Sequence, residues 1–549
     1  MEAAEYPEWG PVSSHGHPFA PRRLPPVAVE SETGAVRLAE LVATLSYAAD
    51  LGLGQPMEHC MRQAVIALRL ADRLELDDSD RVATYYLGLM MNVYCHADAS
   101  EQAKWFGDDI SFKGDAYEML DMSTPQMVAF ILRRVGSGGN RLERAKRLAS
   151  FPVSGYKQVT GFLTTHSTLA SQFAERIELD QAVSVALRHA YEQWDGKGHP
   201  NHLEGEAISL PARLVQLASA VEVFSRTRGI EAARAVARRH RGGQFDPSIA
   251  DLFCAEAPAL LDGIEVASTW DAVIGAEPQL ARWVSGSELD DVLEAMADLV
   301  DLKSPHLAGH SRGVAHLATE AGRVSGLPDH ELAILRRAGF IHDLGRLGVS
   351  NAIWDKPGRL TDAEFERVRL HPYLTDRMLA RVPALANSRE LAARHHERLD
   401  GSGYPRGLSA TSLTPADRLL AAADVYHAMT EPRPYRSALD ADRASAELRA
   451  EAKAGRLDGE AVNAVQKAAG HRAPARREWP GGLTAREVEV LALLARGLSN
   501  KQIAKRLTVA PKTVSNHVEH IYTKIAVSSR ATATLYATQH GLVGSFEPA

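Results

Sequence analysis

Apolar residues recur at the three- and four-residue spacing of buried helices along almost the whole chain. The pattern runs through residues 34–264, which we call the first half, and through residues 265–470, the second half. Shorter helical segments with glycine and Ser-Asn breaks follow in residues 482–544, the C-terminal unit. The pattern therefore predicts an all-α protein with two large helical domains followed by a small four-helix domain.

Two further segments lack a helical period. Residues 1–33 are rich in proline, which predicts a disordered tail. Residues 471–481 are basic and contain proline and glycine, a composition that is typical of linkers.

The two halves are related by an internal repeat. The two copies align in two blocks that an insertion in the first copy separates. In the first block, the offset that aligns Asp50 with Asp301 places His59 opposite His310, and in the second block both copies keep an Asp-Gly-x-Gly-x-Pro turn. The first copy carries an insertion around residues 105–150. We therefore expect two domains of the same helical type in tandem.

Between residues 306 and 436 the second half carries histidines and aspartates that, except for His371, lie in apolar helical patterns. Burying ionisable side chains costs several kcal/mol each unless they are paired or bind a metal. A single buried histidine is most often a satisfied core residue, whereas two doublets and three single residues favour a metal site. Donors without cysteine suit Fe or Mn first, then Zn or Ni. The candidate ligands are His310, His342, Asp343, His371, His395, His396 and Asp424.

The first half has lost most of these ligands. Its two remaining histidines, His59 and His166, cannot by themselves assemble a two-metal site. The first half is therefore either a packing partner for the second or a regulatory half that uses the old cleft without catalysis. The replaced positions are Met91-Asn92 for His342-Asp343, Ala190-Tyr191 for His395-His396, and Ser219 for Asp424.

The second half resembles the HD-GYP family of phosphohydrolases. His342-Asp343 is the HD signature, and HHERLDGSGYPRGL from His395 contains the GYP triplet. The segment ADVYHAMTEPRPYR from Ala423 is similar to the last motif of that family. The resemblance implies an all-α domain that binds metal through the seven candidate ligands and hydrolyses cyclic di-GMP. It also identifies the first half as a degenerate HD-GYP-like domain.

Two departures from the family pattern bear on the chemistry. Arg346 stands in place of a lysine, and a guanidinium can neutralise phosphate charge but cannot donate a proton to the leaving group. His306 stands where members with three metals have an acid, so we expect two divalent ions, with the two oxygens of Asp343 bridging them. The expected catalytic residues are Asp343 and Arg346, and the expected substrate-binding residues are Arg346, Gly403, Tyr404, Arg433 and Arg436.

The C-terminal unit resembles the LuxR-type helix-turn-helix domain over its whole length, through LTAREVEVL from Leu483 and SNKQIAKRLTVAPKTVSNHV from Ser499. Eight Lys or Arg against three Asp or Glu between residues 481 and 544 give the local positive charge that phosphate contact needs. The resemblance implies that a helix from about Pro511 enters the major groove of double-stranded DNA and that the protein is a homodimer. The expected DNA-binding residues are Lys512, Thr513, Ser515, Asn516 and Glu519.

Composition limits where the protein acts. The formal net charge of −7 argues against nonspecific binding of polyanions by the whole chain, so any DNA contact must be local. The three cysteines have no CxxC spacing, which fits a reduced compartment. We find neither a signal peptide nor an apolar run long enough to span a bilayer. We therefore expect a cytoplasmic protein with no membrane partner.

Together these patterns predict a DNA-binding transcription regulator that carries a metal-dependent phosphodiesterase, with cyclic di-GMP or a related nucleotide as the substrate. Two alternatives stay open. The site could be a catalytically weak or inactive sensor of cyclic dinucleotides that controls DNA binding, or the enzyme could act on another phosphoester.

Overall fold

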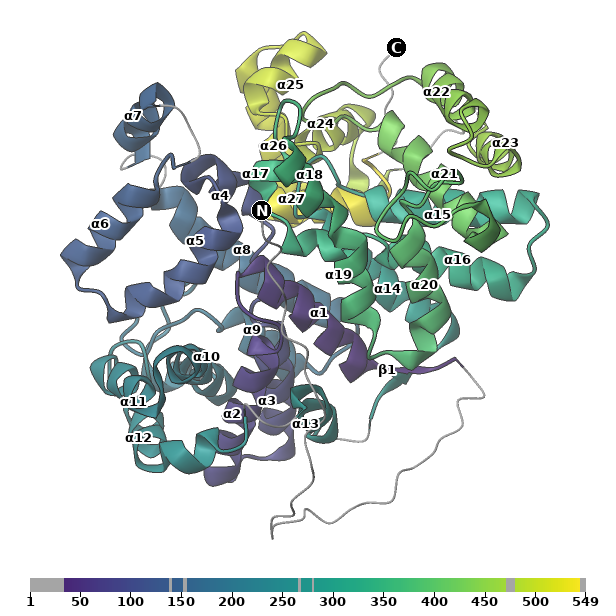
Figure 1. Cartoon of the computed structure of the whole chain (residues 1–549). Coiled ribbons are helices and arrows are strands. Elements are labelled where there is room, and N and C mark those ends of the chain that lie inside the picture. Colours follow the sequence, from purple (N-terminus) through teal and green to yellow (C-terminus); the bar gives the residue numbers. More distant parts are fainter. Residues whose placement is uncertain are drawn as a thin grey trace, which may run out of the picture.

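The computed structural model describes residues 34–137, 141–151, 156–264, 268–278, 281–470 and 479–543. Apart from two short strands, the described regular elements are helices, so the predicted all-α class is confirmed (Figure 1). The predicted tail, residues 1–33, and most of the predicted linker lie outside the described residues. No described helix is long and apolar enough to cross a membrane.

The first half is a bundle of helices with a long insertion between α3 and α8. Its elements are β1 (Val36–Arg37), α1 (Leu38–Gly52), α2 (His59–Arg73), α3 (Asp78–Met90), α4 (Ala99–Phe106), α5 (Asp109–Ala116), η1 (Tyr117–Asp121), α6 (Thr124–Arg134), α7 (Arg141–Ser150), α8 (Tyr156–Arg176), α9 (Gln181–Arg188), η3 (Gly205–Ala207), α10 (Leu210–Arg228), α11 (Ile230–Arg239) and α12 (Pro247–Leu261). Helix α13 (Thr269–Gly275) follows and packs on α1 and α2, where Trp270 stacks on Tyr47.

The second half repeats this arrangement with a shorter connection. Its elements are β2 (Trp283–Val284), α14 (Gly286–Asp301), α15 (His310–Val324), α16 (Asp329–Ile341), η4 (Leu344–Gly348), α17 (Asn351–Trp354), α18 (Asp362–Arg369), α19 (His371–Leu379), η5 (Pro383–Leu385), α20 (Ala386–Arg394), η6 (Ala410–Ser412), α21 (Pro415–Thr430), α22 (Ala441–Lys453) and α23 (Gly459–Ala468).

The same contact between a carboxylate and a backbone amide recurs at the start of α2 in the first half and of α15 in the second. In the first half the buried carboxylate of Asp50 accepts a hydrogen bond from the Cys60 amide at 3.0 Å. In the second half Asp301 accepts from the amide and the hydroxyl of Ser311, at 2.8 and 2.7 Å. Each carboxylate therefore satisfies an N-terminal amide of a helix that would otherwise lack a partner.

The two glycine-rich turns are also built alike. Glu192 accepts the amides of Asn201 and Leu203 at 2.6 and 3.0 Å. Glu397 accepts the corresponding pair, both at 2.8 Å, in the second half. A buried carboxylate thus holds each turn in place, and the internal repeat extends from sequence to structure.

The lead-in segments of the two halves join them. Strands β1 and β2 pair antiparallel, with Val36 opposite Val284, and most residues of α1 are buried. Helix α1 packs on η4 and α19 of the second half (Figure 1). These amphipathic segments are therefore part of a hydrophobic core that is shared by both halves.

A buried ionic cluster crosses the same boundary. Asp109 of α5 and Lys303 of the second half are both fully buried, with 3.8 Å between their charged atoms, and Lys113 lies 3.3 Å from the same carboxylate. Asp109 also accepts the Ser350 hydroxyl at 2.7 Å and the Asn351 amide at 2.8 Å. Burial lowers the pKa of Lys303 to about 8, whereas the two lysines hold the pKa of Asp109 below its ordinary value against the effect of burial.

The C-terminal unit has its own small core and rests on the second half. After η7 (Pro480–Gly482), the predicted four helices are present as α24 (Ala485–Ala495), α25 (Asn500–Leu507), α26 (Pro511–Lys524) and α27 (Arg530–Gln539). Helix α27 packs on α14 and α8, its Leu535 joins the main core, and Arg312 donates to the Gln539 carbonyl at 2.9 Å.

Candidate active site and nucleic-acid interface

The structure brings all seven predicted metal ligands to one place in the second half. They come from helix ends and one helix interior: His310 begins α15, His342 and Asp343 directly follow α16, His371 begins α19, His395 and His396 directly follow α20, and Asp424 lies within α21. His371, which the sequence pattern did not place on a helix, is the first residue of one. Six of the seven are buried and His396 is partly buried.

The two carboxylate oxygens of Asp343 face different histidines. Its Oδ2 lies 3.2 Å from His342 Nε2 and 3.6 Å from His310 Nε2. Its Oδ1 lies 3.4 Å from His371 Nε2 and 3.7 Å from His395 Nε2. One carboxylate therefore stands between two clusters of ring nitrogens, as a ligand shared by two ions would.

Asp424, on α21, also lies between these two clusters of ring nitrogens. Its Oδ1 lies 3.3 Å from His310 Nε2, and its Oδ2 lies 3.7 Å from His396 Nδ1. Three groups of side chains have ligand atoms close enough together to hold an ion. Two are triads of predicted ligands, namely His310, His342 and Asp343, and His371, His395 and His396, and the third joins His310 to His427 and Glu431.

Three of the histidines are oriented by the backbone. The Nδ1 atoms of His342, His371 and His395 lie 2.6–2.7 Å from the carbonyl oxygens of the residues three positions earlier. A carbonyl only accepts, so Nδ1 carries the proton and Nε2 presents its lone pair toward the carboxylates. Metal-bound histidines are characteristically held in this way.

The residues present fit divalent ions. The Nε2 atoms of His310 and His342 and the Oδ1 of Asp343 are buried with no hydrogen-bond partner among the described residues, which is costly unless an ion binds them, and Asp343 Oδ2 is engaged by the ion pair with Arg346. Burial lowers the pKa of His371 to about 4 and of His395 to about 3, so both rings are neutral at pH 7. Burial alone would raise the pKa of Asp343, but Arg346 and His342 hold it well below its usual range. Neutral imidazole and carboxylate are the forms that bind metal.

Arg346 lies beside this centre. Its Nε is 2.7 Å from Asp343 Oδ2, and its guanidinium stacks over the Trp354 ring at 4.7 Å. It lines a cavity of about 150 Å³ together with Arg433 and Tyr435. The arrangement offers two positive charges and an aromatic wall next to the ligand cluster, which suits a phosphate ester of a base-bearing molecule.

The remaining predicted substrate residues divide into two groups. Tyr404 lies against the ligands, with its ring 4.7 Å from that of His396, and Gly403 allows the close turn that places it there. Arg436 instead donates to the carbonyls of Ala428 and Met429 at 2.5 and 3.0 Å, which caps the end of α21. Its guanidinium is therefore occupied by backbone carbonyls at the end of α21.

Two residues near the site were not singled out from the sequence. Glu431 lies 2.9 Å from His310 Nδ1 and 2.9 Å from the Arg433 guanidinium, and His427 Nδ1 lies 3.3 Å from Glu431. Glu431 thus orients the His310 ring from behind, as second-layer carboxylates do at metal sites. The sequence signal that could have identified Glu431 is its spacing, because it follows His427 by four residues, one helical turn, directly after the end of α21.

In the first half the positions that correspond to the doublets and to Asp424 line a cavity of about 240 Å³, together with Tyr117 of the insertion. His59 Nδ1 lies 2.6 Å from Glu222, and its Nε2 lies 3.1 Å from the hydroxyl of Tyr117, which comes from the insertion. Tyr117 also hydrogen-bonds Ser219 at 3.2 Å. His59 has no free ring nitrogen, and His166 pairs with Asp98 at 2.8 Å instead. The two histidines are therefore engaged separately, one by Glu222 and Tyr117 and the other by Asp98.

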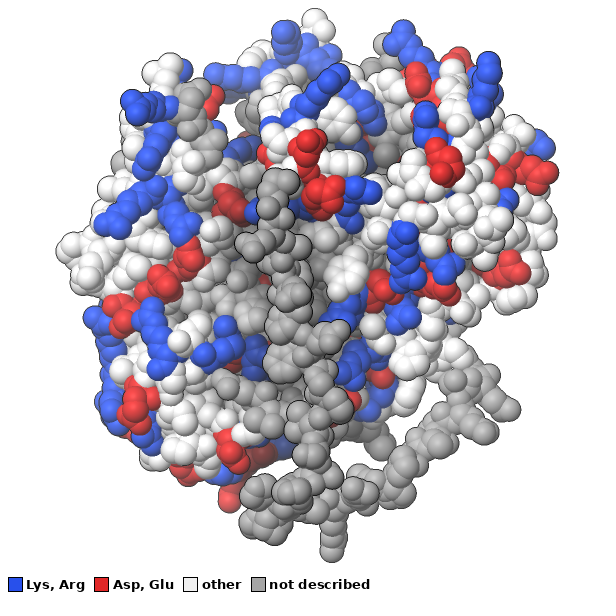
Figure 2. Space-filling model, viewed as in Figure 1, with Lys and Arg blue, Asp and Glu red and all other residues white. Residues whose placement is uncertain are grey.

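The predicted DNA-binding residues all lie on the exposed face of α26. Lys512, Thr513, Ser515, Asn516 and Glu519 are exposed, whereas Val514 and Ile521 of the same helix are buried against the small core. Helix α26 begins at Pro511, as predicted. Figure 2 shows Lys and Arg side chains gathered over the neighbouring α25 at the top of the view. The exposed face and the adjacent basic surface suit a duplex backbone.

Comparisons with known proteins agree with both parts. The family model described as HD domain matches residues 158–249 and 294–461, and that of bacterial regulatory proteins, luxR family, matches residues 482–537. The 3′3′-cGAMP-specific phosphodiesterase 3 of Vibrio cholerae is 32% identical over 413 residues, which cover 74% of this chain and 90% of the relative. A cyclic di-GMP phosphodiesterase of Pseudomonas aeruginosa is 38% identical over 184 residues, 32% of this chain and 43% of that protein.

A solved structure shows the same fold. The crystal structure of a cyclic GMP-AMP specific phosphodiesterase of V. cholerae superposes with a TM-score of 0.53 at 28% identity. The match covers 79% of this chain and 98% of that one.

Proposed function

Because this chain belongs to the HD-GYP family of metal-dependent phosphodiesterases and ends in a LuxR-family domain, we propose that it hydrolyses 3′3′-cGAMP and regulates transcription by binding DNA. The observation that supports 3′3′-cGAMP as the substrate is the length over which the chain matches the cGAMP-specific relative. Similarity to the cGAMP-specific enzyme runs through both halves, while that to the P. aeruginosa enzyme covers 32% of the chain. Cyclic di-GMP, expected from the motifs alone, is the second candidate.

The seven clustered side chains would hold two divalent ions, with Fe or Mn favoured by the donor set. Ions bound there would polarise a phosphodiester and activate water. His371 and His395 contribute neutral nitrogen donors, and Asp343 and Asp424 contribute the negative charge between the two triads.

Arg346 and the glycine-rich turn would position the substrate. Arg346 faces both Asp343 and the adjacent cavity, so its guanidinium can neutralise phosphate charge that develops beside the ligands. It stays protonated, so the leaving oxygen must take its proton from water or from another group. Tyr404 and Trp354 offer aromatic surfaces on which a base can stack.

Turnover by metal-loaded full-length protein tests the enzymatic part. Anaerobically purified protein with Fe or Mn should linearise 3′3′-cGAMP faster than cyclic di-GMP, and Asp343→Ala should abolish both reactions. Faster cleavage of cyclic di-GMP would overturn the substrate assignment. No cleavage of either, with full metal occupancy, would make the site a nucleotide sensor, and recovery of activity by Arg346→Lys would then identify Arg346 as the reason.

Operator binding tests the regulatory part. Asn516 can pair bidentately with adenine, so Asn516→Ala should relax base preference by about 1–3 kcal/mol at one position while nonspecific affinity stays nearly unchanged. Uniform loss across all sequences would contradict that role. Equal operator affinity with and without the cyclic dinucleotide would remove the proposed coupling between the two parts.

A further inference from the structure

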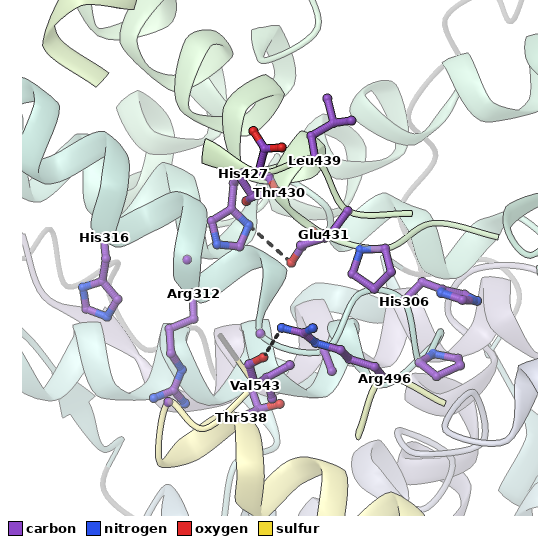
Figure 3. Close-up of a pocket in the computed structure, with 18 of the residues that line it drawn as sticks. His306, Arg312, His316, His427, Thr430, Glu431, Leu439, Arg496, Thr538 and Val543 are labelled. Atoms are coloured by element: carbon purple, nitrogen blue, oxygen red, sulfur yellow. Dashed lines mark hydrogen bonds and ion pairs between the residues drawn. The ribbon is translucent and has the colours of Figure 1, made fainter. Parts of the chain in front are cut away.

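A cavity lies between the second half and the C-terminal unit, away from the metal-facing side of the ligands. It has a volume of about 550 Å³, within the usual size of small-molecule sites. Glu431 and His427 line its wall on the second half, and Arg496 and Arg506 line it from α24 and α25 (Figure 3). Neither arginine has a part in the proposed catalytic centre.

The two arginines bring positive charge without a carboxylate partner. Arg496 is partly buried and donates to the Val543 carbonyl at 2.7 Å, and no described carboxylate lies within ion-pair distance of it or of Arg506. Burial and the nearby Arg506 lower the pKa of Arg496, whereas the charge of Glu431 on the opposite wall of the cavity raises it. Two guanidinium groups that repel one another beside a cavity are stabilised by an anion between them.

The acidic groups on the opposite wall are already neutralised. Glu431 lies within 2.9 Å of both His310 and Arg433. Asp440 accepts the Arg443 amide at 2.8 Å at the start of α22. Arg312, a third arginine at the cavity, is paired with Asp298 and Glu294. The cation pair that remains available therefore belongs to the C-terminal unit.

We propose that this cavity is a second nucleotide site, which binds the linear dinucleotide product through its terminal phosphomonoester. The choice of nucleotide rests on the proposed function. Hydrolysis of one ring ester adds water across a P–O bond and leaves a hydroxyl and a phosphomonoester. That monoester carries close to two negative charges at pH 7, whereas each diester of the ring carries one. Two guanidinium groups thus favour the product over the substrate.

The position of the site gives the product a regulatory role. A dinucleotide in the cavity contacts α24 and α25 on one side and the second half on the other, so it stabilises the docked arrangement of the C-terminal unit. As product accumulates, a larger fraction of the protein would hold the DNA-binding domain in this docked arrangement. The bound anion also lies beside Glu431, which orients His310.

Titration of the chelator-treated full-length chain with linear dinucleotide, pApG or pGpG, tests the proposal, because removal of the ions weakens binding at the catalytic centre. Arg506→Gln should weaken binding at least about tenfold, and Lys505→Gln, which removes an exposed charge one residue away and outside the cavity, should change it by less than about twofold. The cyclic parent should bind at least about tenfold more weakly than the linear form.

Three results would overturn the proposal: unchanged affinity in Arg506→Gln, an equal loss in Lys505→Gln, or equal affinity for cyclic and linear forms. Loss of DNA binding by Arg506→Gln without any effect on the nucleotide would assign the arginine to the DNA backbone. Metal-loaded Arg506→Gln should turn over substrate at the wild-type rate. If the wild type turns over neither cyclic dinucleotide, the proposed function fails. The titration still shows whether the cavity binds the linear dinucleotide.

Discussion

Glu431 illustrates how a residue that touches no reacting atom can set the properties of the catalytic centre. It lies 2.9 Å from the outer nitrogen of His310, so it fixes which nitrogen carries the proton and where the inner lone pair points. The same carboxylate meets His427 and Arg433, and it faces the cavity beneath the C-terminal unit.

Replacing this carboxylate should therefore weaken metal binding without removing a ligand. We expect Glu431→Gln to lower metal affinity by about 10- to 100-fold, measured by competition with a chelator. Glu366→Gln, an exposed glutamate of the same half whose partner is Arg369, is the matched control and should leave the affinity unchanged. Equal affinities in both variants would show that Glu431 only packs.

Glu222 in the first half gives a prediction about pH. His59 and Arg62, at 2.6 and 2.7 Å, and Arg226 hold its pKa at about 2 although burial would raise it. The folded state thus binds this proton more weakly than the unfolded chain, whose value is 4.5. The stabilisation is complete above pH 4.5 and is lost as the pH falls toward about 2.

Glu222→Gln should consequently destabilise the protein by about 3 kcal/mol at pH 7 and by less at pH 3. Denaturant midpoints at the two pH values measure this. Glu231→Gln, an exposed glutamate of α11, should show no such difference. A Glu222→Gln penalty that does not shrink on acidification would mean that the loss comes from packing.

The sequence identified the inward-facing ligands because histidines and aspartates on apolar helical faces are conspicuous. It did not identify Glu431, since a single glutamate beside proline and arginine resembles an ordinary exposed turn. It also assigned Arg436 to substrate, whereas the structure shows its guanidinium on the carbonyls at the end of α21. The sequence shows that an arginine is present, but only the fold shows which groups its guanidinium already binds.

At the scale of elements, the two glycine-rich turns provide a matched pair. A Cβ on Gly403 would lie 2.4 Å from the Arg398 amide nitrogen, and one on Gly198 would lie 2.1 Å from that of Gln193. Both distances are too short for any side chain, so both turns require glycine. Only the second turn carries a residue, Tyr404, that reaches the metal ligands.

Gly403→Ala should therefore lower kcat by at least about tenfold while the ions remain bound, because Tyr404 is displaced. Gly198→Ala should lower thermal stability but leave kcat per folded molecule near the wild-type value. Metal content, melting temperature and turnover of the two variants separate these effects. If Gly198→Ala costs as much activity as Gly403→Ala, the first turn also shapes the active site.

The insertion is the element whose role the sequence could not supply. Its length and position were visible, but its contribution of Tyr117 to the space beside His59 depends on how α4, α5 and η1 fold back over α2. That hydroxyl occupies the ring nitrogen that a metal would need. The first half therefore lacks both histidine-containing doublets, and its remaining His59 is hydrogen-bonded by a tyrosine instead.

At the scale of the whole molecule, the halves are joined across a buried interface that no local pattern could predict, because its partners are far apart in the chain. Asp109 serves Lys113, Lys303, Ser350 and Asn351 at once. The repeat could be recognised from spacing alone, whereas the packing of Asp109, in the insertion of the first copy, against the start of α17 in the second could not.

Asp109→Ala should destabilise the chain by about 3–5 kcal/mol, because it leaves buried lysine charge without a partner. The neighbouring Asp108→Ala removes only the cap of α5, where Asp108 accepts the amides of Ile110 and Ser111, and should cost about 1 kcal/mol. Unfolding in denaturant compares the two. Equal costs would show that Lys303 finds another partner or loses its proton in the variant.

The carboxylate of Asp109 also bears on the history of the gene. After duplication, a copy that no longer binds metal would ordinarily be free to disappear. Here the deletion of residues 34–264 would leave Lys303, which is fully buried, on a newly exposed apolar face without its counter-ion. The second half therefore depends on residues 34–264 for a buried counter-ion, which gives the first half a role in folding that does not require it to bind metal.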